Sequence, residues 1–139
     1  MAGSNLFSLE TTDNFDRSFR KLGKSYKSKS QQTEFANIVS DYISRIVDNP
    51  YLSESRDEPL SGLKIPEGWT FQKLAFTIAK GASGQIRLMY LVNEDMGIVR
   101  ILWIYTHEQF AKRPSNKDLK DVIVEAFPED DCIDINNIF

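Results

Sequence analysis

The residues best suited to chemistry follow one strongly apolar segment, residues 98–105. His107, the single histidine of the chain, comes just after it, and Lys112 and Arg113 follow within six residues. An imidazole with an unperturbed pKa of about 6.5 can accept or donate a proton near neutral pH. Because a strand end holds side chains at the surface on a rigid base, these three residues could act on a phosphate. The alternatives are that His107 caps the turn before Pro114 and that the two cations form a soluble flank.

The charged residues are unevenly distributed, although the net charge is only −3. Six cations and no acid occur between residues 17 and 29, whereas acidic residues predominate between 125 and 134. A dense basic block can contact phosphates or an acidic protein, and a solvated helix face is the alternative explanation. The candidates for contact with a partner are Arg17, Arg20, Lys21 and Lys24.

Composition indicates one globular domain over residues 1–139, because 41% of the residues are hydrophobic and 12% are aromatic. We expect residues 1–5 and 129–139 to be flexible tails. The single cysteine, Cys132, excludes an internal disulfide and disfavours a cysteine-based metal site. No apolar run reaches the roughly 18 residues that a membrane span needs, so we expect a cytoplasmic protein with no membrane partner.

Known small-molecule enzyme motifs are missing from the sequence. It contains no Gly-rich phosphate loop, no nucleophile elbow and no H-E-x-x-H pattern. We therefore expect no cofactor and no metal ligands.

Two helices are predicted in the first half of the chain. The first begins at Thr12 or Asp13, and the second begins with a capping box of Ser28 and Gln31 and ends at Asn49. A short polar link between them predicts an antiparallel pair. Helical spacing relates two sets of apolar residues: Phe15, Phe19, Leu22 and Tyr26, then Phe35, Ile38, Val39, Tyr42, Ile43, Ile46 and Val47.

Strand patterns surround these helices. We predict strands over residues 6–11, 69–79, 85–93 and 98–106, a connecting loop over residues 51–68, and a last helix opened by Ser115. The order β-α-α-β-β-β-α predicts an α+β fold in which a helical hairpin packs on an antiparallel sheet, with a further helix at the C-terminal end.

Three segments resemble the RelE/ParE superfamily of toxins from toxin-antitoxin systems. Residues 59–63 match a P-L-x-G-L loop, residues 85–92 contain an R-x-x-Y pattern in a middle strand, and residues 97–105 match an apolar strand with a functional end. The resemblance covers roughly Phe7 to Phe127 and implies a RelE-like fold. The chain departs from the family in its acidic pI of about 5.2 and in having one lysine, Lys73, where the second strand of ribosome-dependent nucleases carries two.

The resemblance implies a compact toxin neutralised by a cognate antitoxin protein. Members of the family either cleave mRNA in the ribosomal A site without a metal or, in the ParE branch, poison DNA gyrase. By position, Arg87 matches a mid-strand arginine that contacts the scissile phosphate, and His107 falls where the family places an arginine, lysine or histidine for proton transfer or electrostatic stabilisation.

Hairpin geometry permits Arg87 and His107 to share one site. If residue 92 pairs with residue 98, Arg87 lies opposite Trp103, and His107 lies four residues further along, roughly 13 Å away. The turn at residues 81–84 places Lys80 near Gln85, so Lys80 is the third catalytic candidate. Substrate contacts are assigned to Lys73, Lys112, Arg113 and Tyr105. The alternatives are a structural ion pair for Arg87, and sheet packing for Tyr90, Trp103 and Tyr105.

Two classes of function are consistent with these residues. The first is a metal-independent endoribonuclease toxin with an antitoxin, the ribosome and mRNA as partners. The second is a non-catalytic protein of the same fold that binds a protein through its helical pair, either DNA gyrase or a scaffold partner.

Overall fold

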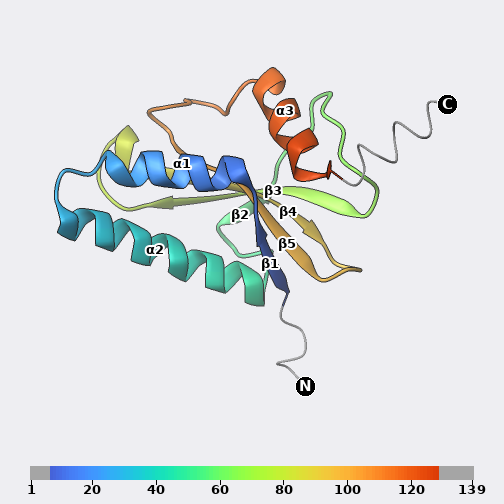
Figure 1. Cartoon of the computed structure of the whole chain (residues 1–139), viewed down its shortest axis with the longest axis horizontal. Helices are drawn as coiled ribbons and strands as arrows, with labels where there is room; N and C mark the ends of the chain where they lie inside the picture. Colours follow the sequence, from blue (N-terminus) through green and yellow to red (C-terminus); the bar gives the residue numbers. More distant parts are fainter. Residues whose placement is uncertain (1–6, 129–139) are drawn as a thin grey trace.

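The computed structural model describes residues 7–128 and has an α+β architecture with three α-helices and a five-stranded mixed sheet (Figure 1). The predicted tails, and Cys132 with them, lie outside the described residues. The elements in chain order are β1 (Ser8–Thr11), α1 (Asp13–Lys24), α2 (Lys29–Asp48), β2 (Ser55–Asp57), β3 (Trp69–Thr77), the 3-10 turn η2 (Ala82–Gly84), β4 (Gln85–Asn93), β5 (Ile98–Thr106) and α3 (Asn116–Ala126).

The sheet has the strand order β1-β5-β4-β3-β2. β3, β4 and β5 form the predicted antiparallel meander, but β1 pairs in parallel with β5, so the prediction of a purely antiparallel sheet is wrong. β2 was predicted as loop and instead pairs with β3 at the sheet edge. Its three residues have too short a pattern to signal a strand, and only the neighbouring strand supplies their hydrogen-bond partners.

The helix boundaries follow the predicted capping residues. The Thr12 side chain accepts a hydrogen bond from the backbone N–H of Phe15, and Ser28 and Gln31 form both halves of a capping box. α2 ends at Asp48, directly before Asn49. Figure 1 shows α1 and α2 joined by a short turn and running in opposite directions, which confirms the predicted helical pair. No helix within residues 7–128 is long and apolar enough to cross a bilayer.

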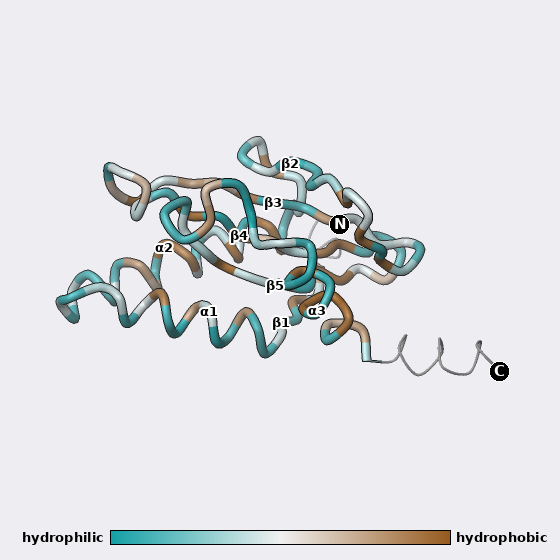
Figure 2. The backbone as a smooth tube through the Cα atoms, turned by 90° about the horizontal axis from the view of Figure 1, so that it is seen from above, coloured by the Kyte–Doolittle hydropathy of each residue, from teal (hydrophilic) through white to brown (hydrophobic). Residues whose placement is uncertain are grey.

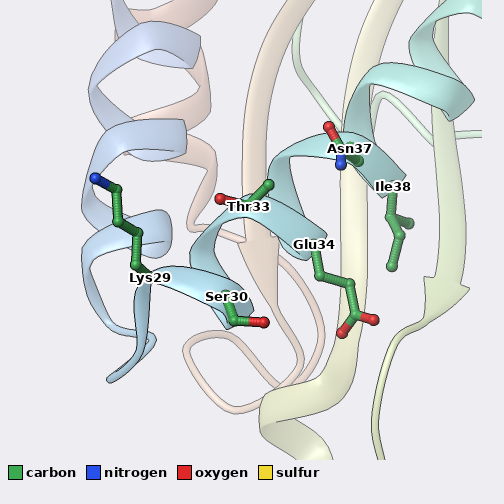
Figure 3. Close-up of a pocket in the computed structure, with 6 residues that line it drawn as sticks. All are labelled: Lys29, Ser30, Thr33, Glu34, Asn37 and Ile38. Carbon is green, nitrogen blue, oxygen red and sulfur yellow. The ribbon is translucent and has the colours of Figure 1, made fainter.

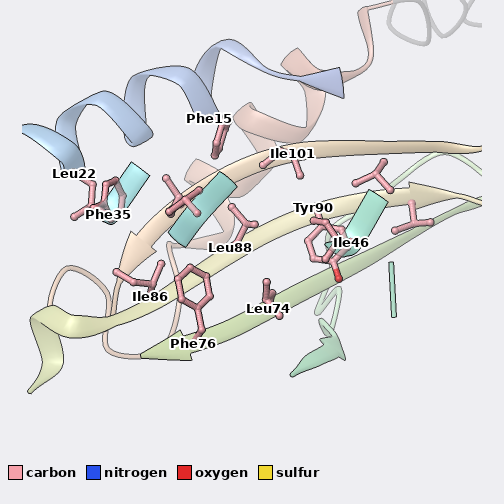
Figure 4. Packing of buried hydrophobic residues seen from close by; sticks show 14 residues of the cluster. Phe15, Leu22, Phe35, Ile46, Leu74, Phe76, Ile86, Leu88, Tyr90 and Ile101 are labelled. Carbon is pink, nitrogen blue, oxygen red and sulfur yellow. The ribbon is translucent and has the colours of Figure 1, made fainter. Parts of the chain in front are cut away.

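The helical pair covers one face of the sheet with an apolar core (Figure 4). Alternate residues of β4 point into this core, which follows from the two-residue period of a strand. Figure 2 shows that hydrophilic segments predominate along α1, whose few apolar residues face the sheet. The fully buried members of this core include Ile46, Leu74, Ile86, Leu88, Tyr90 and Ile101.

The opposite face of the sheet packs against α3 and the loop after β2. The other alternate residues of β4, Met89 and Leu91, join this second core. Arg100 ties the start of β5 to the end of α3: its guanidinium lies 4.7 Å from the Trp69 ring centroid and 5.0 Å from that of Phe127, and it donates to the Ala126 carbonyl. α3 therefore covers the part of the face near the β4–β5 turn.

Candidate functional site

A bulge in β4 and β5 sets the position of Arg87. From Asn93 to Tyr90 the strands pair in one register, and after a shift between Met89 and Tyr90 they pair in another. Arg87 consequently lies opposite Tyr105, two residues from the predicted partner Trp103. One residue of this difference comes from the turn, where Val92 pairs with Val99 and not with residue 98, and the other comes from the bulge. The prediction assumed an unbroken ladder, and an inserted residue changes every pair beyond it.

His107 lies closer to Arg87 than the sequence predicted. Its backbone N–H donates to the Gln85 carbonyl at 2.9 Å, so His107 is opposite Gln85, two residues beyond the Arg87–Tyr105 pair. At about 3.3 Å per residue this is a separation of roughly 7 Å along the strand, compared with the roughly 13 Å first expected. Continued alternation assigns Arg87 and His107 to the same face of the sheet.

His107 does not close the turn that follows β5. That turn is held by Thr106 and Gln109, each of which donates its backbone N–H to the side-chain oxygen of the other, at 2.9 and 3.1 Å. His107 is half-buried, and no hydrogen bond of its imidazole is found within residues 7–128. The capping alternative for His107 is therefore not supported.

Arg87 is a half-buried cation without an acidic partner in the described part of the chain. Its guanidinium donates to the Ile86 carbonyl at 3.1 Å and to Oε1 of Gln85 at 3.4 Å, and both acceptors are neutral. None of the salt bridges among residues 7–128 involves Arg87. The alternative of a structural ion pair therefore finds no support, and the guanidinium keeps donors for an anion.

Glu58 joins two of the cations that were predicted to contact substrate. Its carboxylate lies 3.2 Å from Lys73 Nζ and 2.8 Å from a terminal guanidinium nitrogen of Arg113. The residue is only 8% exposed. Arg113 also donates to the Pro59 carbonyl and to the Asn116 side chain, so it is part of the structure and not a soluble flank. A substrate phosphate would have to compete with Glu58 for Lys73 and Arg113.

Sequence reasoning missed Glu58 because it lies in the segment predicted as a loop. Its backbone N–H donates to the Phe71 carbonyl, which extends the β2–β3 pairing by one step and turns the side chain toward Lys73. A carboxylate directly before a Pro-Leu pair is a weak signal, since acidic residues are common in loops.

Tyr105 packs as a core residue, in agreement with the alternative that the sequence left open. The residue is fully buried, and its ring meets Phe110 edge to face with centroids 5.5 Å apart. Its hydroxyl group has no hydrogen-bond partner within residues 7–128, and burial raises the pKa of this phenol above its usual value. Glu58, Arg87 and Arg113 all lie close enough to influence it electrostatically.

The remaining lysine candidates lie on exposed connections. Lys80 is three residues beyond Thr77, the end of β3, in a connection that spans residues 78–84 and not the predicted four. Lys80 therefore lies beyond the end of the sheet. The prediction had placed it beside Gln85 by extending the paired strands to the turn. Lys112 is exposed in the segment before α3. Neither lysine forms a salt bridge with residues 7–128.

Four exposed cations form a stripe along α1, which we call the basic stripe: Arg17, Arg20, Lys21 and Lys24. Their i, i+3, i+4, i+7 spacing places them on one side of the helix, away from the buried Phe15 and Leu22. One member of the stripe, Arg17, forms an exposed salt bridge with Glu125 of α3 at 3.6 Å. The predicted basic helix face is therefore present on α1.

Surface features elsewhere bring none of these residues together. A shallow hollow along α2 is lined by polar residues and Ile38 and contains no predicted site residue (Figure 3). Within residues 7–128, no group of three or more histidine, cysteine, aspartate or glutamate side chains is placed to hold a metal ion.

Comparison with known proteins gives one structural similarity. No protein-family model and no curated protein sequence matches this chain. The free-state structure of an E. coli toxin RelE mutant, with two arginines replaced by alanine, is similar at 12% sequence identity. The alignment covers 89% of this chain and 97% of that chain, with a TM-score of 0.42. At this sequence identity and TM-score, the likeness supports no conclusion about chemistry.

Proposed function

We propose that this protein is a metal-independent endoribonuclease, the toxin of a toxin-antitoxin pair, that cleaves mRNA at the sheet end bearing Arg87 and His107. A protein antitoxin would neutralise it, and the ribosome would present the mRNA. The observation that carries the proposal is the half-buried Arg87 guanidinium, which has neutral acceptors only and lies two strand positions from the single histidine.

The chemistry requires one proton acceptor and one cation. In the proposed step, neutral His107 accepts the proton of a ribose 2′-OH while the 2′-oxygen attacks the adjacent phosphorus. The bond from phosphorus to the 5′-oxygen breaks, and that oxygen takes a proton from solvent, which leaves a 2′,3′-cyclic phosphate and a 5′-hydroxyl. Arg87 would stabilise the negative charge that develops on the phosphoryl oxygens.

The surrounding charges support an anionic substrate. Lys80 and Lys112 are exposed and not neutralised within the described residues, so they can contact flanking phosphates. Lys73 and Arg113 are held by Glu58, and we propose that they add positive potential with weaker direct contact. Three charges, Lys73, Arg113 and Arg87, against one carboxylate leave the face electropositive.

The test is cleavage of a defined mRNA by purified protein, with and without ribosomes, with the 5′ ends mapped and the cyclic phosphate assayed. Arg87→Ala and His107→Ala should each lower the cleavage rate by about 10² to 10³-fold. Arg45→Ala is a matched control, because Arg45 is an exposed arginine of α2 paired with Glu54. Equal cleavage by all four proteins would overturn the proposal.

A second function is favoured by the basic stripe on α1. We propose as the alternative that the protein acts by binding a protein partner, DNA gyrase or a scaffold protein, without cutting RNA. Neutralising all four residues of the stripe to glutamine should then abolish capture of the partner, while Arg87→Ala should leave capture unchanged. Capture that survives the quadruple change would exclude this surface.

A further inference from the structure

Lys73, one of the two cations paired with Glu58, lies on the same face of the sheet as Arg87. Lys73 pairs with Met89, which packs in the core on the α3 side, and Arg87 is two residues before Met89 on β4. Side chains two residues apart on a strand point to the same face, so Lys73 and Arg87 share that face. One strand spacing and two residues of rise put their Cα atoms roughly 8 Å apart. An RNA strand whose scissile phosphate meets Arg87 therefore brings a neighbouring phosphate close to Lys73.

The two cations retain exposed surface, whereas the carboxylate between them has little. The side chains of Lys73 and Arg113 are 24% and 15% exposed, and that of Glu58 is 6% exposed. A phosphate can approach the cations from solvent, but the carboxylate stays 3.2 Å from Lys73 Nζ and 2.8 Å from the Arg113 guanidinium. At such a buried position water screens charges poorly, so an incoming anion meets the repulsion of Glu58 together with the attraction of the cations.

Both cations have a place in the structure that does not require Glu58. Arg113 also donates to the Pro59 carbonyl and to the Asn116 side chain, which hold its guanidinium from two further elements. The backbone of Lys73 is fixed in β3, which pairs with a strand on each side, so its side chain stays on this face. Loss of the carboxylate therefore removes a competing charge and leaves both cations near the site. A positioning residue would have the opposite effect, because its loss would weaken anion binding.

We infer that Glu58 is a built-in competitor of the RNA backbone: it occupies Lys73 and Arg113 in the free protein and lowers the affinity of the site for RNA. A bound strand has to share these cations with the carboxylate, so RNA binds more weakly than the number of cations alone would allow. The inference rests on the proposed function and adds to it a residue that restrains substrate binding. The same carboxylate offsets the repulsion between two cations in the fold, so stability and RNA affinity are opposed at Glu58.

The experiment measures binding of a 2′-O-methyl RNA oligonucleotide of mixed sequence to the full chain. The 2′-O-methyl group blocks the attacking hydroxyl, so binding is separated from cleavage. Glu58→Gln should tighten binding by about tenfold at low salt. The slope of log affinity against log salt should become steeper by roughly 0.7 for each phosphate newly contacted. Glu54→Gln, which removes an acid from an exposed pair with Arg45, is the matched control and should leave the affinity unchanged.

A second background tests whether the effect passes through Lys73. In the Lys73→Gln protein, adding Glu58→Gln should tighten binding by about threefold or less, because only Arg113 is then released. An undiminished gain in that background would overturn the inference. This pair of proteins has no two cations facing each other without a counter-charge, so it carries the test even where Glu58→Gln alone is too unstable. Urea unfolding establishes that each variant is folded, and added oligonucleotide should raise the urea midpoint of Glu58→Gln more than that of the natural chain.

The outcomes separate the inference from the function. If Glu58→Gln binds RNA no more tightly than the natural chain while Arg87→Ala abolishes cleavage, Glu58 is not a competitor and the nuclease stands. If Glu58→Gln binds more tightly but the natural protein cuts no RNA, the competitor stands and the nuclease falls. Absence of RNA binding in the natural chain and in every variant also overturns the inference.

Discussion

Tyr90 and Tyr105 are both fully buried in the sheet, on opposite faces, and their hydroxyl groups differ in hydrogen bonding. On the face covered by α1 and α2, the Tyr90 hydroxyl meets Ser55 Oγ at 2.8 Å and donates to the Pro50 carbonyl. On the face covered by α3, the Tyr105 hydroxyl has no partner within residues 7–128. The contrast holds for this pair of tyrosines and not for the whole of each face, because the Tyr26 hydroxyl on the helical-pair side also has no partner within residues 7–128.

The difference extends to the charged residues. Lys73, Arg87 and Arg113 lie on the α3 side with one carboxylate, Glu58, among them. Native cores seldom retain unsatisfied polar groups, and those that persist tend to mark functional sites. The α3 side therefore gathers three cations around one carboxylate, and the hydroxyl of Tyr105 on that side has no partner within residues 7–128.

The largest expected effect comes from removing the charge of Glu58. Glu58→Gln should lower the free energy of unfolding by about 3 kcal/mol, because Lys73 and Arg113 then lie close together without their shared counter-charge. Urea denaturation at pH 7 measures it. Glu54→Gln, which breaks an exposed pair with Arg45, is the matched control and should have a much smaller effect. Similar losses in the two variants would mean that the Glu58 cluster is as weak as a surface pair.

The two tyrosines can be compared directly by removing each hydroxyl. Tyr90→Phe should cost about 1 to 3 kcal/mol, because it leaves Ser55 and the Pro50 carbonyl buried without their partner. Tyr105→Phe should be close to neutral, because no hydrogen bond is lost. Equal losses of stability in urea would contradict the contrast between the two tyrosines.

Alkaline pH should destabilise the protein through the same two residues. Burial raises the pKa of Tyr90 to about 12, and it raises that of Tyr105 as well, while an unfolded tyrosine ionises near pH 10. The folded state therefore holds these protons more tightly than the unfolded state does. The protonated tyrosines contribute fully to the free energy of unfolding below pH 10, and this contribution is lost as the pH rises from 10 toward 12. Urea midpoints between pH 8 and 11 should fall less steeply for Tyr105→Phe than for the natural chain. A slope identical to that of the natural chain would show that Tyr105 does not contribute.

The smallest effect is expected at the basic stripe. Arg17→Gln should change the free energy of unfolding by less than about 0.5 kcal/mol, because the Arg17–Glu125 pair is exposed and long at 3.6 Å. Thermal unfolding in low and high salt checks this. A loss above about 1 kcal/mol would show that the contact with α3 is structural and would weaken the case for a free docking surface.

The helices and the meander strands could be predicted because their signals are local. Capping by Thr12 and Ser28 and the apolar spacing of α2 depend on residues within a few positions of one another. β2 could not be predicted in this way. It becomes a strand only by pairing with Leu74 and Gln72 of β3, which lie outside the range of any local sequence pattern.

The candidate site was predicted in part. Arg87 and His107 fall on the strand and strand end where the sequence placed them, but their register differs from the prediction by two residues, one from the β4–β5 turn and one from the bulge between Met89 and Tyr90. Glu58 and its two ion pairs escaped prediction, because Lys73 and Arg113 are 40 residues apart and meet only through a third residue.

The sequence by itself determined the three helices and the strands of the meander, together with an arginine within the middle strand and a histidine just after the last strand. Tertiary structure alone decided which cations are neutralised, which hydroxyl is left without a partner and how far Arg87 lies from His107. The physical reason is range: periodicity and capping act over a few residues, whereas charge pairing, burial and strand register depend on groups that only folding brings into contact.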